Sequence, residues 1–241
     1  MKLLIFLIAV TTTQCSVPPN FKRCLRKDPE FKKCYIKAAQ FGITQLTKPY
    51  KAFDLPNLEP LLVPSLTIAG RGGVVDVDQT FKNCKVHGLT TMKLDKFELN
   101  FTNKTLDIVA GIKKLVFECE YKLDGKVLLL TIQGEGDSLI TFSDFRAVFN
   151  ASFEEVTKGA KTYYKTGRTE LVSRTGNMHF QFDNLFNGNK ELGDNINSVL
   201  NDNWKQIFDE LYPDYNEVVR RILTDIMTKI WDNVSLEEFF D

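Results

Sequence analysis

The sequence predicts an α+β fold in which a long C-terminal helix packs against a curved antiparallel β-sheet. Between Ser65 and about Asp183, apolar residues alternate with polar ones, which is typical of antiparallel strands with one apolar face. From Asn189 to Trp231, apolar residues recur every three or four positions, which is typical of an amphipathic helix. If continuous, such a helix is roughly 60 Å long and needs a long apolar trough. The sheet is the available partner.

The N-terminus has the layout of a secretory signal peptide. An early lysine precedes an apolar block at residues 3–10 (LLIFLIAV), and small or polar residues follow it. The block is too short to span a bilayer. We therefore expect residues 1–15 to be a signal peptide, cleaved after Cys15 or Ser16, and residues 16–241 to form one soluble, exported domain. No later segment approaches an unbroken apolar run of about 18 residues, so we expect no membrane insertion.

Export gives the cysteines a structural role. The chain has five cysteines, and loss of the first with the signal peptide leaves an even set that allows three pairings. The spacing of Cys24 and Cys34 suits a disulfide that ties the N-terminus to a first helix, and Cys84 with Cys119 then follows by elimination. No CxxC or HxxxH pattern occurs, so we predict neither a metal site nor a cofactor.

The first helix is expected to run from Pro29 to about Leu46, with Asp28 as its N-cap. The next stretch, TKPYKAFDLPNLEPLLVP, is rich in proline and should form an extended connector. The residues expected to anchor this connector to the core are Leu55, Leu58 and Leu61.

Period-two alternation then predicts the strands of the sheet. The alternating runs are residues 97–101, 115–123, 127–131, 145–153 and 178–182. Asp124-Gly125 is expected to be a two-residue hairpin turn. The glycines of GRGG (70–73) and GEG (134–136) do not continue to GK[ST], so we interpret them as strand ends or bulges and not as phosphate loops.

The C-terminal helix is expected to begin after Asn189 as its N-cap and to break or kink at Pro213. A slot left between this helix and the sheet would suit a small apolar ligand. The residues alone favour the alternative, a solid core. The candidate wall residues of such a slot are Phe97, Leu99, Phe117, Phe149, Phe180, Ile196, Leu200, Trp204 and Ile207.

Three segments in order, CLRKDPEFKKC, LPNLEPLLVPSLTI and NLFNGNKELGDNINSVLNDNW, resemble the insect takeout and juvenile-hormone-binding protein family, and its takeout-like branch in particular. The similarity runs from about Phe21 to the C-terminus. It implies a long helix wrapped by a strongly curved antiparallel sheet around a hydrophobic tunnel, as in tubular lipid-binding domains. Cys24 and Cys34 match the disulfide pair of the family, whereas the pairing of Cys84 with Cys119 rests on counting.

The resemblance also implies a non-enzymatic carrier of a small hydrophobic ligand in extracellular fluid, such as a terpenoid hormone, a fatty acid or another long-chain lipid. Basic and acidic residues balance at 31 each, so charge does not favour nucleic acid as a partner. No GxSxG is present, and both His87 and His179 are expected at the surface, which argues against a lipid-ester hydrolase. The remaining alternative is a secreted protein–protein recognition module with a vestigial tunnel.

Four sequons make the chain a candidate glycoprotein. Alternation places two of them on the polar faces of strands, where a sugar would have room. We expect one or two of the four to be occupied. The four asparagines are Asn100, Asn103, Asn150 and Asn233.

Overall fold

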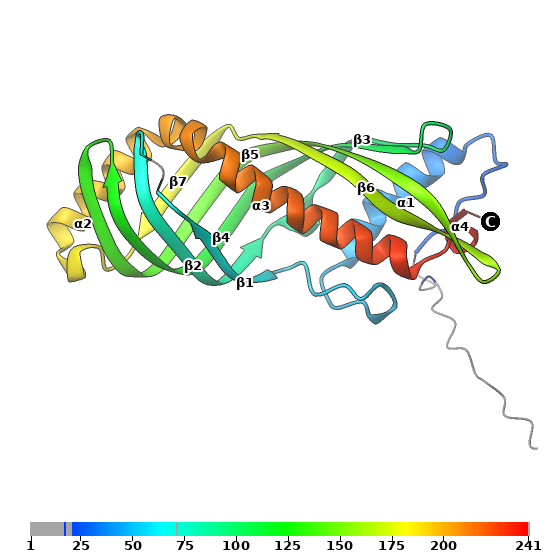
Figure 1. Cartoon of the computed structure of the whole chain (residues 1–241), viewed down its shortest axis with the longest axis horizontal. Coiled ribbons are helices and arrows are strands. Elements are labelled where there is room, and N and C mark those ends of the chain that lie inside the picture. The colour runs from blue at the N-terminus through cyan, green and yellow to red at the C-terminus, as the bar shows by residue number, and fades with distance from the viewer. Residues whose placement is uncertain (1–16, 18–20, 71, 241) are drawn as a thin grey trace, which may run out of the picture.

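The computed structural model describes residue 17, residues 21–70 and residues 72–240. The predicted signal peptide and its cleavage site lie outside these residues. The described chain is elongated: a strongly curved antiparallel sheet wraps around a long helix, α3, that lies along its open side (Figure 1). The strands are β1 (Leu61–Ile68), β2 (Val75–His87), β3 (Lys93–Asn100), β4 (Thr105–Val127), β5 (Leu130–Lys158), β6 (Lys161–Arg174) and β7 (Asn177–Phe182). The helices are α1 (Phe31–Gln45), α2 (Lys190–Asp202), α3 (Trp204–Asn233) and α4 (Leu236–Phe240), with 3₁₀ turns at Lys51–Phe53, Leu89–Thr91 and Phe186–Gly188.

The two longest strands, β4 and β5, form the spine of the sheet and pair with each other along their lengths. On the side away from β5, β4 pairs with β2 and with β3. On the side away from β4, β5 pairs with β6 and with β7. Every pair is antiparallel, as predicted. Long twisted strands coil, so this arrangement curves into a trough instead of a flat layer. The sheet does not close on itself, and α3 lies across the gap (Figure 1).

The hairpin turn predicted at Asp124-Gly125 is wrong. β4 continues to Val127, and the turn consists of Leu128 and Leu129, both at positive φ (51° and 70°). Gly125 lies inside the strand at a φ of 152°, where a Cβ would lie 2.1 Å from the Asp76 carbonyl oxygen of β2. The glycine therefore permits a close approach between two strands, a role that a strand glycine often has.

The glycines of GEG also lie inside a strand and not at a strand end or bulge. A Cβ on Gly134 would lie 2.9 Å from the Cα of Leu185, and one on Gly136 would lie 2.8 Å from the carbonyl oxygen of Asp183. Both glycines thus let the segment after β7 cross close to β5. The GRGG segment, in contrast, falls between β1 and β2, at strand ends as predicted.

Two predicted boundaries near the N-terminus are shifted. α1 begins at Phe31 and not at Pro29, because Asp28 Oδ1 accepts the Glu30 N–H (2.8 Å) in a turn that precedes the helix. The connector is buried at its three predicted leucines, but β1 already begins at Leu61. Pro64 lies within β1, which is tolerated because β1 is the outer strand of the sheet and that residue does not pair with β2.

The C-terminal helix begins as predicted, with Asn189 Oδ1 accepting the Leu192 N–H (3.2 Å). Its interruption falls at Asn203 (φ −110°, ψ 19°), whereas Pro213 lies inside α3. At Asn203 the side chain donates to the Val199 carbonyl (2.8 Å), and such local bonds compete with a regular helix. Pro213 is exposed, where water can reach the carbonyl that its missing N–H leaves free.

Two asparagines of α2 complete the hydrogen bonds of the free edge of β7. Asn201 accepts the Phe180 N–H (2.7 Å) and donates to the Phe180 carbonyl (2.9 Å). Asn197 does the same for Phe182, at 3.0 Å in both directions. The i, i+4 spacing places both amides on one face of α2. These side chains take the place of a neighbouring strand.

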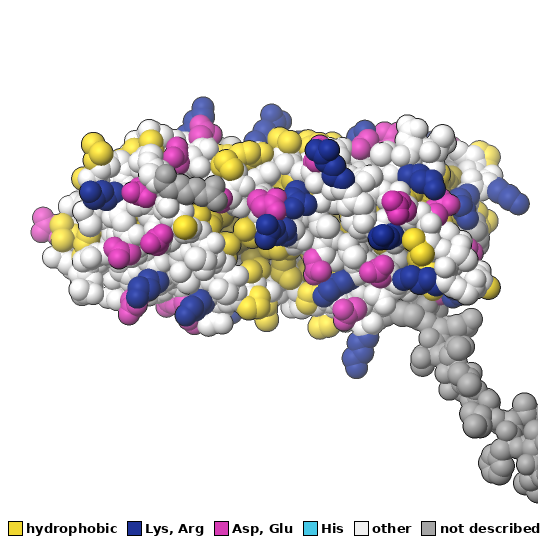
Figure 2. All heavy atoms as spheres, viewed as in Figure 1, with side chains coloured by type: hydrophobic (Ala, Val, Ile, Leu, Met, Phe, Trp, Pro, Cys, Tyr) yellow, Lys and Arg dark blue, Asp and Glu magenta, His cyan; other side chains and the backbone are white. Residues whose placement is uncertain are grey.

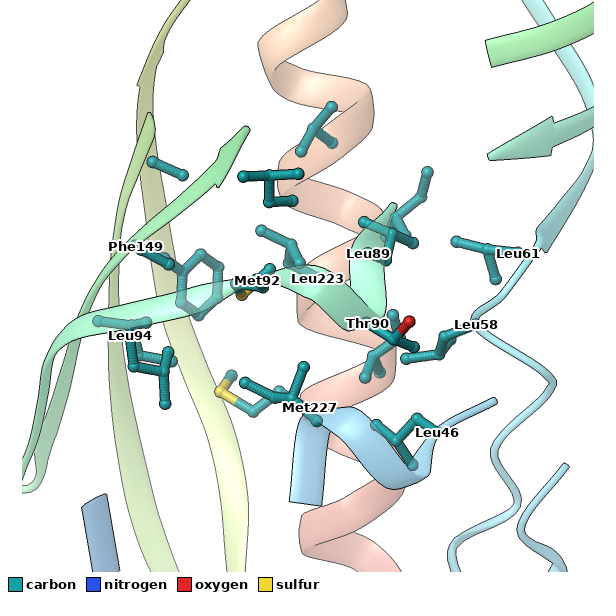
Figure 3. Close-up of a pocket in the computed structure, with 18 of the residues that line it drawn as sticks. Leu46, Leu58, Leu61, Leu89, Thr90, Met92, Leu94, Phe149, Leu223 and Met227 are labelled. Atoms are coloured by element: carbon teal, nitrogen blue, oxygen red, sulfur yellow. The ribbon is translucent and has the colours of Figure 1, made fainter. Parts of the chain in front are cut away.

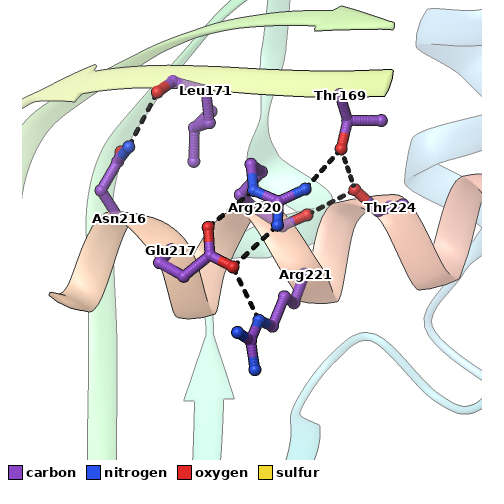
Figure 4. Close-up of polar contacts among 7 residues, drawn as sticks. All are labelled: Thr169, Leu171, Asn216, Glu217, Arg220, Arg221 and Thr224. Carbon is purple, nitrogen blue, oxygen red and sulfur yellow. Dashed lines mark hydrogen bonds and ion pairs between the residues drawn. The ribbon is translucent and has the colours of Figure 1, made fainter. Parts of the chain in front are cut away.

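A row of polar contacts, here called the polar seam, joins α3 to β6, a strand at one edge of the sheet (Figure 4). Arg220 donates two bonds to the Glu217 carboxylate (both 2.7 Å) and a third to the Thr169 hydroxyl (2.6 Å). Further along, the Asn216 amide donates to the Leu171 carbonyl (2.7 Å). The bonds from Arg220 to Thr169 and from Asn216 to Leu171 link α3 to β6. Because these groups are partly buried and need partners, the bonds hold α3 against this edge of the sheet.

The two disulfides are Cys24–Cys34, between the N-terminal segment and α1, and Cys84–Cys119, between β2 and β4. These are the pairs that spacing and elimination predict. None of the helices in the described part of the chain combines the length and apolarity needed to span a membrane.

Candidate functional site

A cavity of about 440 Å³ lies between α3 and the concave face of the sheet. This volume falls within the range of small-molecule sites, about 300–1,000 Å³. The lining follows α3 from Phe208 to Trp231, which corresponds to roughly 35 Å of helix. Nearly all of the lining side chains are apolar, so the cavity is elongated and suited to an apolar occupant.

The cavity is lined by several elements that are far apart in the sequence (Figure 3). Phe149 comes from β5, and Leu223 and Met227 come from α3. On the other side, Leu89 and Met92 belong to the short segment around the second 3₁₀ turn, next to residues of α1 and of the connector. The central residues drawn around this space are Leu46, Leu58, Leu61, Leu89, Thr90, Met92, Leu94, Phe149, Leu223 and Met227.

The cavity is incompletely covered along one side of α3. Leu66 of β1 and Val218 and Ile222 of α3 line it, and all three are partly exposed. Apolar side chains are visible among the charged ones near the middle of the face on which α3 lies (Figure 2). Partly exposed apolar side chains therefore border the cavity on this side.

Sequence reasoning placed the sheet side of the cavity better than the helix side. Of the predicted wall residues, Phe97, Leu99, Phe117 and Phe149 line the cavity. The other five do not line it: Phe180, Ile196, Leu200, Trp204 and Ile207 belong to or pack against the main apolar core instead. They lie in β7, in α2 and in the first turn of α3, where the chain fills the end of the trough. The cavity begins only beyond that end. Contact of any of the nine with a ligand stays a prediction.

The helix residues that the prediction missed lie further along α3. They include the pairs Val218-Val219, Ile222-Leu223 and Ile226-Met227, all of which line the cavity. Adjacent apolar pairs that repeat every four residues do predict a buried face of the helix, but the pattern does not show whether that face meets a core or a cavity. The residues of α1, such as Ala38 and Gly42, had no such signal.

Most polar side chains on the lining already have protein partners. The Tyr215 hydroxyl donates to Gln79 Oε1 (2.9 Å), the Tyr212 hydroxyl accepts the Ser173 N–H (3.3 Å), and Thr90 donates to Glu59 Oε2 (3.2 Å). Burial raises the pKa of the Tyr215 hydroxyl, with a smaller contribution from the Asp214 carboxylate. The tyrosine therefore stays neutral at physiological pH, and the cavity holds few groups that would repel a hydrocarbon.

Neither histidine lines the cavity. His179 is exposed, as predicted. His87 is partly exposed, and its ring nitrogens lie 3.4 Å from a Glu59 oxygen and 3.7 Å from a Glu118 oxygen. Among the described residues, no group of three or more His, Cys, Asp and Glu side chains is arranged to hold a metal ion.

The sequons lie away from the cavity. Asn103 is exposed in the turn between β3 and β4, and Asn100 accepts the Asn103 N–H (2.9 Å) at the start of that turn. Asn150 is partly exposed and donates to the Asp107 carboxylate of β4 (2.7 Å). Asn233 donates to the Lys229 carbonyl (2.8 Å) near the end of α3. Glycosylation at these positions stays a prediction.

Comparisons with known proteins agree with this geometry. The family model for haemolymph juvenile hormone binding protein matches residues 3–241. The circadian clock-controlled protein daywake of Drosophila melanogaster is 26% identical over 232 residues, which cover 93% of this chain and 88% of the relative. Its counterpart from Drosophila yakuba is 24% identical over 231 residues (92% and 88%).

Among solved structures, Takeout 1 of Epiphyas postvittana superimposes with a TM-score of 0.80 at 20% identity, covering 91% of this chain and 99% of that one. This likeness shows a shared fold: an open antiparallel sheet and a long C-terminal helix. With the family model spanning nearly the whole sequence, the chain belongs to the haemolymph juvenile hormone binding protein family.

Proposed function

We propose that this protein is a secreted carrier that binds one elongated hydrophobic molecule in the cavity beneath α3. The observation that carries the proposal is the apolar cavity of about 440 Å³, which follows α3 over many turns. Each buried CH₂ group contributes about 0.8 kcal/mol, so burial of a chain of about ten carbons contributes about 8 kcal/mol. That corresponds to micromolar affinity before the cost of ordering the ligand is subtracted, so longer chains are expected to bind more tightly. Terpenoid hormones, fatty acids and other long-chain lipids all have suitable chemistry.

Export is supported by the predicted signal peptide and by the two disulfides, which persist in oxidising compartments. The family description names haemolymph and juvenile hormone, and hydrophobic ligand binding characterises that family. For this chain we propose the same general function, binding of an apolar ligand in extracellular fluid, and no particular hormone.

A fluorescence experiment tests the proposal. The purified protein should take up N-phenyl-1-naphthylamine, and an organic extract of the protein should contain an apolar molecule. Leu223→Trp places an indole in the cavity and should lower the affinity for the fluorophore by more than about tenfold, by excluding its volume.

The matched control is Leu192→Trp on α2, because Leu192 is 47% exposed and does not line the cavity. It should leave fluorophore binding unchanged. An empty extract together with no uptake by the unsubstituted protein would instead favour the recognition module with a vestigial tunnel.

A further inference from the structure

One hydroxyl on the cavity lining differs from all the others. Among the described residues, Tyr164 Oη is the one buried side-chain nitrogen or oxygen atom that has no hydrogen-bond partner in the protein. Tyr164 itself is only 3% exposed and lines the cavity. A buried hydroxyl without a partner costs about 1–3 kcal/mol, and buried tyrosines usually find one. Such an atom requires an explanation.

The position of this hydroxyl is fixed by its neighbours. The Tyr164 ring packs against Phe153 (ring centroids 4.1 Å apart) and against Trp231 of α3 (5.4 Å), and those two rings also contact each other (5.5 Å). The three rings form one cluster at the Trp231 end of the cavity. Because the ring is held by aromatic contacts, the hydroxyl cannot move to a new partner without disrupting them.

The contrast with the other tyrosines of the lining is direct. The hydroxyls of Tyr212 and Tyr215 are engaged by Ser173 and Gln79, and Tyr35 accepts the Leu99 N–H (3.4 Å). Those hydroxyls serve the fold. The hydroxyl of Tyr164 has no partner, and Tyr164 lines a cavity whose other side chains are mostly apolar.

We propose that Tyr164 is the polar anchor of the ligand site: its hydroxyl donates a hydrogen bond to an uncharged oxygen at one end of the ligand. An ester, ketone, ether or alcohol oxygen fits this position. The hydrocarbon part of the ligand then extends from the Trp231 end along α3 toward Phe208. The inference rests on the proposed carrier function and adds the chemical class and the orientation of the ligand.

The burial of Tyr164 favours a neutral acceptor over a carboxylate. Glu155 pairs directly with Tyr164 across β5 and β6, so both side chains lie on the same face of the sheet. Burial, and then the Glu155 carboxylate, raise the pKa of Tyr164, while Arg26 acts in the opposite direction. The hydroxyl therefore remains a proton donor at physiological pH. A carboxylate buried against it would lose its hydration, which is costly, whereas a neutral oxygen loses far less.

The test compares three straight-chain probes of similar length: methyl dodecanoate, tridecane and dodecanoate. Each displaces N-phenyl-1-naphthylamine from the purified protein. Tyr164→Phe removes only the hydroxyl, and we expect it to weaken binding of the ester by about three- to tenfold, the value of one hydrogen bond. Binding of the hydrocarbon should not weaken, and the ester should bind more tightly than the carboxylate.

The matched control is Tyr212→Phe, which removes a hydroxyl from the same cavity that the protein already uses. It should not change the ratio of ester to hydrocarbon affinity. The melting temperature of ligand-free Tyr164→Phe should equal or exceed that of the parent protein, because the change removes an unpartnered buried group.

Several outcomes would overturn the anchor role. These are an unchanged affinity ratio in Tyr164→Phe, an equal loss for ester and hydrocarbon, tighter binding of dodecanoate than of the ester, or a clear loss of stability in the ligand-free variant. In each case the parent protein still binds the fluorophore, so the carrier function survives. If the parent protein binds neither fluorophore nor probe, the carrier function fails and the anchor fails with it.

Discussion

The two ends of the C-terminal helical region carry the same types of apolar side chain, but one end packs into a core and the other lines a cavity. At the α2 end, Leu200 (4% exposed) and Ile207 (2%) are packed into a solid core against the sheet. Further along α3, Ile222 and Ile226 are only half-buried and face the cavity. Composition does not distinguish the two ends. What differs is whether the helix and the sheet leave a space between them, which they do only beyond the solid end.

The largest expected effect concerns the covalent link in the cavity wall. The Cys84–Cys119 disulfide joins β2 and β4 across 35 residues, and both of its cysteines line the cavity. Replacing both with alanine should lower the free energy of unfolding by about 4 kcal/mol, against about 3 kcal/mol for the shorter Cys24–Cys34 loop, because loop-closure entropy grows with loop length. Urea unfolding of both double variants measures this. A smaller loss at Cys84–Cys119 would mean that packing alone maintains the hollow part.

Truncation of isoleucine on α3 tests the comparison directly. Ile207→Ala should cost about 2–5 kcal/mol, because it opens a new cavity in a packed core. Ile226→Ala should cost about 1 kcal/mol, because that side chain already borders empty space. The same urea titration compares them, and fluorophore binding should change only for Ile226→Ala. Equal costs would show that the cavity side is packed as tightly as the solid end.

The asparagines that cap β7 should contribute at the solid end. Asn201→Ala leaves the Phe180 N–H and carbonyl without their partners and should cost about 2–3 kcal/mol. Asn201→Asp keeps the acceptor but places a carboxylate against the Phe180 carbonyl, so it should be at least as destabilising. The control is Asn195→Ala on the exposed side of α2, which we expect to be near neutral in thermal melting. An unchanged melting temperature for Asn201→Ala would contradict the interpretation that the Asn201 side chain takes the place of a neighbouring strand.

The smallest expected effect is a gain in stability. Gly193 lies in α2, where a Cβ would sit 3.7 Å from the Leu185 Cβ, an ordinary contact. Gly193→Ala should therefore stabilise the protein by about 0.5–1 kcal/mol through helix propensity. Gly188→Ala should destabilise it, because Gly188 has a φ of 83°. A loss of stability in Gly193→Ala would show that the solid end has no room for one methyl group.

The sequence predicts the architecture well because that depends on periodicity. The switch from alternation to helical spacing identifies the sheet and the C-terminal helix, and Asn189 is recognisable as an N-cap by residue type. The roles of the glycines were harder to predict. Gly125, Gly134 and Gly136 are required by close contacts with segments more than 40 residues away in the chain. A local turn rule cannot register such contacts.

The cavity residues could be predicted only in part, for a related reason. Strand alternation shows which side of β3, β4 and β5 is apolar, so Phe97, Phe117 and Phe149 were found. Whether a helix residue meets a solid core or a void depends on the distance to the sheet, which no sequence period encodes. Tyr164 could not have been found at all, because its significance lies in the absence of a partner within the fold.

The bonds from Asn197 and Asn201 of α2 to the edge of β7 affect how molecules of this protein can associate. A bare strand edge offers N–H and carbonyl groups to any extended chain, which is how many β-rich proteins begin to form fibrils. Asn197 and Asn201 occupy those groups on β7, Asn216 occupies the Leu171 carbonyl on β6, and Pro64 withholds a donor from β1 on the opposite side. We expect an open sheet built in this way to remain monodisperse in concentrated solution.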